Sequence, residues 1–309
     1  MRRVASLGGL ALCAALVLSG CGGGSKARPD LLFVSTKGGV YDVYEMNADG
    51  SDQSRLSSGS SGNATTEQGL FHARDPAYSK DGKHIAFVSA RTGSLDVYVM
   101  DANGKNVRQI SSTASEDSHP SWSPDGKRIV FVRGKVGAIF VMNADGSGVK
   151  RVTHGTTEES DPAWSPDGKW IAFVRLTAGT PVREVWLVHP DGTGAKMLTS
   201  LAASVNGPAW SPDGKQIAFS SDARGGHFAI YTIDVSGLGL RLVSGGSVDS
   251  YSPAWSPDGK QIAFSRNGSI VIATIGGGEK AVTKPQDNDT TPVWNPIPAP
   301  AKKKSSSGY

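Results

Sequence analysis

The segment Pro120-Ser121-Trp122-Ser123-Pro124-Asp125-Gly126-Lys127, followed by the apolar run from Ile129 to Arg133, decides the fold. The same pattern returns, with its turn kept, at 75–83, 161–169, 207–215 and 252–260, and the segment 291–296 keeps only its start. The prolines that begin the six copies are 44, 42, 46, 45 and 39 residues apart. This spacing is the repeat length of a four-stranded propeller blade.

Each copy reads as four short strands. Pro-x-Trp-Ser is an inner strand, and Pro-Asp-Gly-Lys is a tight turn in which glycine accepts a positive φ. The next run, such as Ile129 to Arg133, is apolar on both faces, as expected for a strand packed between neighbouring blades. A third strand (138–142), a second turn (143–146) and a short outer strand (150–153) complete the unit.

The two ends of the repeat region give the number of blades. Residues 31–35, 41–46 and 55–56 match the second, third and fourth strands of a unit, and residues 291–296 match a first strand. Joining the two ends completes one blade and leaves no open sheet edge. The sequence therefore predicts an all-β fold, a six-bladed β-propeller of four-stranded blades in which the N-terminal strands complete the last blade.

These repeats resemble those of the TolB-like, WD-type propeller family, whose hallmark is Pro-x-Trp-Ser-Pro-Asp-Gly-Lys followed by Ile-Ala-Phe. The resemblance covers residues 30–296. It implies a six-bladed propeller and favours a binding role. Similar repeats also form the regulatory propeller of prolyl-oligopeptidase-like enzymes and the body of some pectin-degrading lyases, so the fold alone does not choose between binding and catalysis.

The first residues have the pattern of a bacterial lipoprotein signal. Arg2 and Arg3 precede an apolar run (7–18) that is too short for a permanent membrane span, and the run ends in Leu-Ser-Gly-Cys at residues 18–21. This end resembles a lipobox, in which Cys21 is lipidated. We expect a signal peptide at 1–20, a lipidated Cys21 with a flexible tether at 21–29, the propeller at 30–298 and a disordered tail at 299–309.

The number of cysteines and the distribution of charge argue against an internal disulfide and against a nucleic-acid-binding protein. Cys13 leaves with the signal, so Cys21 has no partner for an internal disulfide. The formal net charge is +4, but five positive charges lie in Arg2, Arg3 and Lys302 to Lys304, which leaves the folded body near −1. A nucleic-acid-binding protein carries a basic stripe on its folded body, and none is evident here.

Two repeated residue types are interpreted as structural. The aromatic residue of each inner strand packs one blade against the next, because it recurs in every unit. The aspartates of the Pro-Asp-Gly turns need no metal to explain them. No nucleophile elbow, His-Glu-x-x-His helix or phosphate-binding loop occurs in the chain. We therefore assign no catalytic residue, no metal ligand and no cofactor.

Function is expected where the blades differ. The loops that join successive blades lie together on one face, around the mouth of the central channel. The residue before each inner proline is expected to point into the channel; these residues are Asp75, His119, Asp161, Gly207, Ser252 and Thr291. Further candidates in the loops of this face are His72, Glu116, Asp117, His154, Glu158 and Glu159.

The prediction is a monomeric, extracytoplasmic lipoprotein, held at a membrane by Cys21, that binds an envelope protein or peptide through its loop face. One alternative is an extracytoplasmic enzyme, such as a sugar lyase or hydrolase, that uses the histidines and carboxylates at the channel mouth. Another is a sensor for a small ligand or a metal.

Overall fold

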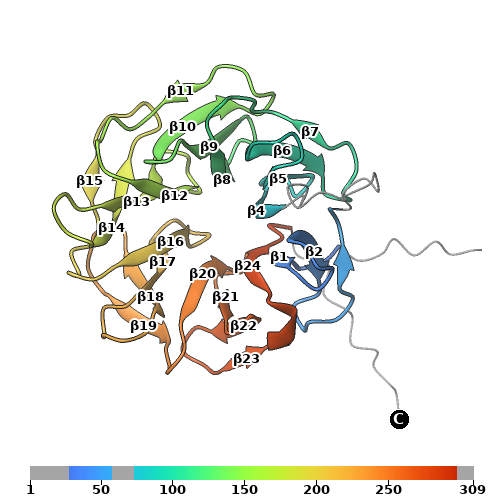
Figure 1. Cartoon of the computed structure of the whole chain (residues 1–309). Helices are drawn as coiled ribbons and strands as arrows, with labels where there is room; N and C mark the ends of the chain where they lie inside the picture. Colours follow the sequence, from blue (N-terminus) through green and yellow to red (C-terminus); the bar gives the residue numbers. More distant parts are fainter. Residues whose placement is uncertain (1–27, 58–72, 298–309) are drawn as a thin grey trace, which may run out of the picture.

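The computed structural model describes residues 28–57 and 73–297. The predicted signal peptide, Cys21, most of the tether, His72 and the C-terminal tail lie outside these residues. The described residues form six four-stranded antiparallel sheets arranged in a ring around a central opening (Figure 1). The all-β, six-bladed propeller predicted from the sequence is therefore confirmed.

The first three blades follow one another along the chain, with the innermost strand first. Blade 1 contains β4 (Arg74–Tyr78), β5 (His84–Ser89), β6 (Asp96–Asp101) and β7 (Arg108–Gln109). Blade 2 contains β8 (Asp117–Trp122), β9 (Arg128–Arg133), β10 (Ala138–Asn143) and β11 (Lys150–Arg151). Blade 3 contains β12 (Glu159–Trp164), β13 (Ile171–Leu176), β14 (Arg183–Val188) and β15 (Lys196–Met197).

The last blade joins the two ends of the propeller. Blade 4 contains β16 (Val205–Trp210), β17 (Gln216–Ser221), β18 (Ala229–Asp234) and β19 (Arg241–Ser244). Blade 5 contains β20 (Ser250–Trp255), β21 (Gln261–Arg266), β22 (Ser269–Thr274) and β23 (Glu279–Ala281), and a short 3-10 helix, η1 (Pro285–Asp287), follows it. Blade 6 is built from β24 (Thr290–Trp294), β1 (Leu31–Ser35), β2 (Asp42–Met46) and β3 (Ser54–Arg55).

The closure of the ring is a pairing between β1 and β24. Leu31 lies opposite Trp294, and the Asn295 backbone N–H donates to the Asp30 carbonyl at 2.8 Å. The Asn295 side chain donates to the Pro29 carbonyl at 3.0 Å. Both ends of the described chain therefore lie at the same edge of blade 6.

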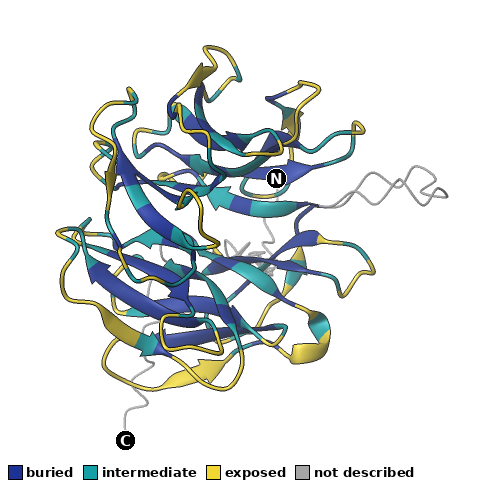
Figure 2. Ribbon diagram, turned by 60° about the vertical axis from the view of Figure 1, so that its left-hand side comes forward, coloured by how far each residue is buried: buried dark blue, intermediate teal, exposed yellow. Residues whose placement is uncertain are grey.

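The core lies between the blades rather than inside any one of them. The second strand of every blade carries a phenylalanine with no exposed surface; these are Phe33, Phe87, Phe131, Phe173, Phe219 and Phe264. In one cluster, Val97 and Val99 of blade 1 pack with Trp122 and Ile129 of blade 2. Figure 2 shows the buried residues along the strands and the exposed residues at the connections.

The turn between the first and second strands is built the same way in five blades. In blade 2 the Ser123 hydroxyl donates to Asp125 Oδ1 at 2.6 Å and accepts from the Arg128 backbone N–H at 2.9 Å. The Lys127 backbone N–H donates to the same carboxylate oxygen at 3.1 Å. The Ser123 hydroxyl, the largest influence, lowers the pKa of Asp125 below its usual value. This supports the interpretation of the repeated aspartates as turn residues.

The outer strand of blade 2 is shorter than predicted. The sequence favours a fourth strand over 150–153, but β11 ends at Arg151. Thr153 instead turns its hydroxyl inward to accept from the Ile139 backbone N–H at 3.0 Å and to donate to the Glu159 carboxylate. The same bond from the third strand to a hydroxyl recurs at Ser57, Ser111, Thr199 and Thr283.

Because the strands of each blade are antiparallel, the ring has two distinct faces. We call loop face the side with the connections between blades and between second and third strands. We call turn face the side with the turns between first and second strands and between third and fourth strands. No helix among the described residues is long and apolar enough to cross a bilayer.

Candidate functional site

The residue before each inner proline has an unusual backbone. All six residues lie in the left-handed region, with φ between 49° and 59°; they are Asp75, His119, Asp161, Gly207, Ser252 and Thr291. A β-bulge causes this: Ser118 pairs with Val132 and Ser121 with Val130, so that two residues of β8 oppose one residue of β9. The bulge also accommodates the proline, which has no N–H to donate to the sheet.

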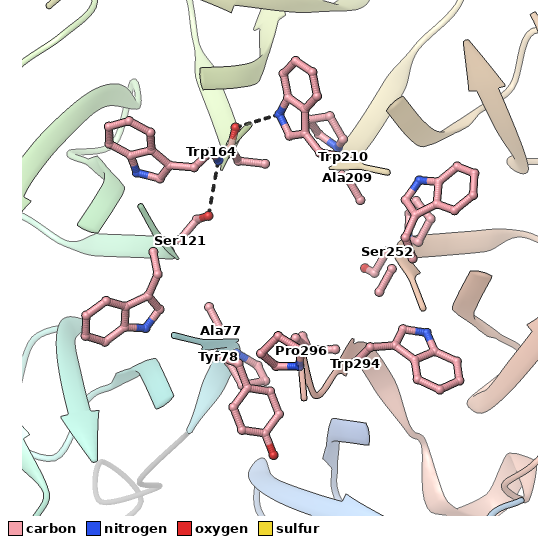
Figure 3. Close-up of a pocket in the computed structure, with 18 of the residues that line it drawn as sticks. Ala77, Tyr78, Ser121, Trp164, Ala209, Trp210, Ser252, Trp294 and Pro296 are labelled. Atoms are coloured by element: carbon pink, nitrogen blue, oxygen red, sulfur yellow. Dashed lines mark hydrogen bonds between the residues drawn. The ribbon is translucent and has the colours of Figure 1, made fainter. Parts of the chain in front are cut away.

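The six inner strands enclose a central cavity of about 440 Å³, and all six of these residues line it. Behind them come small side chains, namely Ala77, Ser121, Ala163, Ala209, Ala254 and Val293. The wall at the turn face is formed by Pro124, Pro166, Pro212, Pro257 and Pro296, with Lys80 in the equivalent place in blade 1. Because small side chains line its middle, the channel keeps an open interior at the level shown in Figure 3.

The tryptophans of the inner strands turn away from the opening and lie between blades (Figure 3). The indole N–H of Trp210 donates to the Ala163 carbonyl of the preceding blade at 3.0 Å. Trp122 and Trp164 are at least nine-tenths buried. This placement agrees with their interpretation as packing residues rather than as a platform for sugars.

The channel mouth at the loop face has a charged half, formed by blades 1 to 3. Nε2 of His119 lies 3.4 Å from Oδ1 of Asp161, and its backbone N–H donates to Oδ2 of Asp75 at 3.4 Å. Nε of Arg74 lies 3.8 Å from the same Asp75 oxygen. The other half, from blades 4 to 6, presents Gly207, Ser252 and Thr291.

His119 is held between two carboxylates. Burial disfavours its protonation and is the largest single influence, but Asp75 and Asp161 together outweigh burial and the repulsion from Arg74. The pKa of His119 is therefore raised above its ordinary value. A protonated His119 would link blades 1, 2 and 3 at the mouth.

The other predicted loop residues divide into two groups. Glu116 and His154 are exposed, and Glu158 is half-buried and paired with Arg183 at 3.0 Å. Asp117 and Glu159 do not lie on the surface of the loop face, because both are buried and paired with Arg133 at 2.8 Å and Arg175 at 2.7 Å, respectively. These two acids hold the inner strand to the second strand, and we remove them from the binding candidates.

Sequence reasoning missed two basic residues near the channel. Arg74 directly precedes Asp75, and Lys80 replaces the second proline of the repeat. Comparison of the copies with one another would have singled out Lys80. Among residues 28–57 and 73–297, no group of three or more histidine, cysteine or acidic side chains is arranged to hold a metal ion.

Comparison with known proteins gives a family match and several structural neighbours. The family model described as TolB beta propeller domain matches residues 66–204 and 158–299. A curated, uncharacterized protein of Agrobacterium fabrum is 33% identical over 85 residues, which is 28% of this chain and 26% of that protein. The match thus spans about a quarter of the relative's length.

The solved structures agree in fold at low sequence identity. TolB from Acinetobacter baumannii superposes with a TM-score of 0.73 and 22% identity, over 87% of this chain and 67% of that chain. A chain from a nidogen/laminin complex superposes with a TM-score of 0.69 and 11% identity, over 86% of this chain and 98% of that chain. These likenesses concern the fold.

Proposed function

Because this chain belongs to the TolB β-propeller domain family, we propose that it is a lipid-anchored envelope protein whose loop face binds a protein or peptide. The observation that carries the proposal is the uneven mouth of the channel. One half offers Asp75, His119 and Asp161, and the other half offers only small, uncharged groups. Such a mouth orients an elongated ligand, because a basic group prefers one half and a neutral segment the other.

The fold neighbours support a protein as the partner. The nidogen/laminin structure is a complex, and its matching chain covers 86% of this chain, compared with 87% for TolB. The exposed Glu116 and His154 and the half-buried Glu158 lie in the connections beside the charged half of the mouth and extend the surface available to a partner. We infer that the mouth supplies specificity and that the surrounding loops supply area.

The anchor is proposed from the sequence. Cys21 follows Leu18-Ser19-Gly20 at the end of the apolar run, where a lipidated cysteine is expected. Two or three acyl chains hold a protein stably at a bilayer, whereas one does not. The test is the mass of the N-terminal peptide from the membrane fraction: acyl chains on Cys21 support the anchor, and an unmodified Cys21 refutes it.

The binding proposal is tested by capture from the native cell envelope after gentle crosslinking. The bait is the full chain, compared with a variant that carries Asp75→Asn, His119→Gln and Asp161→Asn. A matched control carries Asp145→Asn, which removes an exposed carboxylate from the turn face. One abundant protein caught by the parent and the control, and lost by the triple variant, is the expected result. Equal capture by all three baits would refute a role for the mouth.

One feature favours a second candidate, an extracytoplasmic hydrolase or lyase. Asp161, which lies 3.4 Å from Nε2 of His119, is the kind of partner that orients a general base. This candidate predicts turnover of a glycan or peptide by the parent chain and its loss in His119→Gln. If the chain binds compounds of the same screen without turning them over, the enzymatic candidate is refuted and only the binding role remains.

A further inference from the structure

The exposed apolar side chains are unevenly distributed over the propeller. Among residues 28–57 and 73–297, six large apolar residues at least 39% exposed lie at the turn face; they are Val107, Val149, Leu238, Leu240, Ile275 and Ile297. In the loop-face connections that the structure describes, only Tyr41, Val136 and Val248 are comparably exposed. Over the described residues, the turn face therefore exposes more large apolar side chains than the loop face does.

The densest group lies in the connection between β18 and β19 of blade 4. Leu238 is 72% exposed, Leu240 is 41% exposed and Leu242, in β19, is 38% exposed. These three leucines lie within five residues, two in the connection and one at the start of β19. Their contact with water costs free energy that burial of their apolar surface would recover. This segment has the composition of a surface that becomes covered.

The fold does not require a leucine at position 238. The Asp234 backbone N–H donates to the Leu238 carbonyl at 2.9 Å, and the same turn bond is made in each of the other blades. The residues that supply the equivalent carbonyl in those blades are Ser51, Lys105, Ser147, Thr193 and Gly278. Leucine at 238 thus departs from polar or small residues at every equivalent turn, although the backbone is unchanged.

Both ends of the described chain leave from this same face. Pro29 and Asn295 are joined by a hydrogen bond, and a Cβ at Gly82, in the first turn of blade 1, would lie 3.1 Å from the Asn295 amide oxygen. Only the eight residues 22–29 separate Cys21 from this point. A flexible segment of that length has a mean extent of about 16 Å. A lipid on Cys21 would therefore hold the turn face close to the bilayer.

We propose that the turn face lies against the membrane, with Leu238 and Leu240 inserted among the lipid headgroups and upper acyl chains, and that the loop face points away. The inference rests on the proposed lipid anchor. It commits to lipid as the partner of the leucines, because the anchor brings lipid to this face. The orientation leaves the channel mouth, with Asp75, His119 and Asp161, open to a partner from the opposite side.

The test places one fluorescent probe on each face of the full chain. Lipidation blocks Cys21, and Cys13 leaves with the signal, so a cysteine at Leu238→Cys or Val136→Cys is the free thiol of the mature protein. Val136 is 63% exposed in the connection between β9 and β10, on the loop face, and is the matched control. Each labelled chain is placed in vesicles of phosphatidylethanolamine and phosphatidylglycerol that carry a lipid-bound quencher.

We expect a blue-shifted probe at 238 that is quenched several-fold more than the probe at 136. Equal quenching of the two probes, or a water-exposed probe at 238, would overturn the inference. As a second measurement, amide exchange of residues 234–241 should slow on vesicles in the parent chain. The slowing should vanish in Leu238→Ser with Leu240→Gln, because Ser51 and Gln53 stand at the equivalent positions of the same turn in blade 6.

The mass of the peptide that contains Cys21, measured on the same preparation, shows whether the cysteine is acylated. It therefore distinguishes a failure of the proposed orientation from a failure of the proposed anchor. Acylated Cys21 with a water-exposed probe at 238 refutes the orientation and keeps the anchor. Unmodified Cys21 refutes the anchor. Because Cys21 is then a second free thiol, the vesicle measurement is repeated with Cys21→Ser added to Leu238→Cys, so that the probe at 238 alone reports whether this position meets lipid. Quenching at 238 in that case would support the leucines as a membrane contact in their own right.

Discussion

At the scale of single residues, the channel mouth combines strain with charge. Five of the six residues before the inner prolines carry a side chain in the left-handed region, where only Gly207 is free of the steric cost. The cost is about 1–2 kcal/mol for an ordinary residue. Strain kept at equivalent positions of five blades shows that the bulge is part of the architecture, while the differing side chains give each blade its own chemistry.

Thr291 is the residue at which this strain is greatest, because it is β-branched and has a φ of 50°. Thr291→Gly should raise the free energy of unfolding by about 0.5–1 kcal/mol, since relief of strain exceeds the added entropy of the unfolded chain. Thr290→Gly, in the extended part of the same strand, should lower it. Denaturant unfolding of the three proteins measures both changes, and a loss of stability in Thr291→Gly would contradict the account.

The pH response of the mouth follows from His119. Because Asp75 and Asp161 raise its pKa above the ordinary value of 6.5, protonated His119 stabilises the folded chain. This contribution is complete below pH 6.5 and is lost as the pH rises through the raised pKa. Asp161→Asn should lower the pKa of His119, as read from an NMR titration of its ring protons, whereas Asp145→Asn should not. An unchanged titration in Asp161→Asn would refute the coupling.

The sequence identified the mouth but not its geometry. The residues of the ring could be named because each directly precedes a repeated proline. Their left-handed backbone could not be foreseen, because a residue before proline favours the extended region and only the bulge overrides that preference. Asp117 and Glu159 were misplaced for a related reason: their arginine partners are 16 residues away, on the next strand.

At the scale of elements, each blade repeats one plan with local substitutions. The second strands were predicted within a residue or so of their observed bounds, because apolar runs between turns are unambiguous. The outer strand of blade 2 was overestimated, because Thr153 bonds β10 through its side-chain hydroxyl and is not part of the ladder between β10 and β11. Patterns of hydrophobicity do not contain that information.

Blade 6 departs from the plan in a way that can be measured. Asp289 occupies the place that Asp117 has in blade 2, but it faces Ser35 where blade 2 has Arg133. Its carboxylate is fully buried without a hydrogen bond of normal geometry. Burial raises the pKa of Asp289, and the nearby hydroxyls of Ser35 and Thr283 oppose the shift without cancelling it.

Asp289→Asn should therefore raise the free energy of unfolding at pH 7 by about 1 kcal/mol. Because the pKa of Asp289 is raised in the folded chain, its protonated form favours the fold. This contribution is complete below the ordinary pKa of 3.8 and is lost as the pH rises through the raised pKa. The gain from Asn should accordingly shrink towards pH 4. Asp117→Asn is the control and should lower stability by about 1.5–3 kcal/mol, because it weakens the pair with Arg133. Thermal unfolding across pH distinguishes the two, and a destabilised Asp289→Asn would contradict the argument.

At the scale of the whole molecule, closure of the ring depends on one strand, β24. β24 supplies the inner strand of blade 6 and covers β1, whose Leu31 and Phe33 are fully buried. Without it, β1 would present an unpaired, apolar edge, which is a template for aggregation.

Removal of residues 290–309 should give a chain that aggregates and has lost cooperative unfolding, whereas removal of 298–309 alone should leave both unchanged. Size-exclusion chromatography and thermal unfolding of the two truncated chains measure the difference. A monomeric, cooperatively folded product of the longer truncation would show that β24 is dispensable.

The same closure also sets an order of events during biogenesis. The groups that bond at the seam, in Pro29 and Asn295, are 266 residues apart along the chain, and β24 is the last strand of the ring to leave the ribosome. Bringing such distant segments together costs about 3 kcal/mol more loop entropy than forming a hairpin. Blades 1 to 5 can assemble while synthesis continues, but the seam must wait for the final strand. The ring therefore remains an open arc for nearly the whole of translation and closes only after β24 has been made.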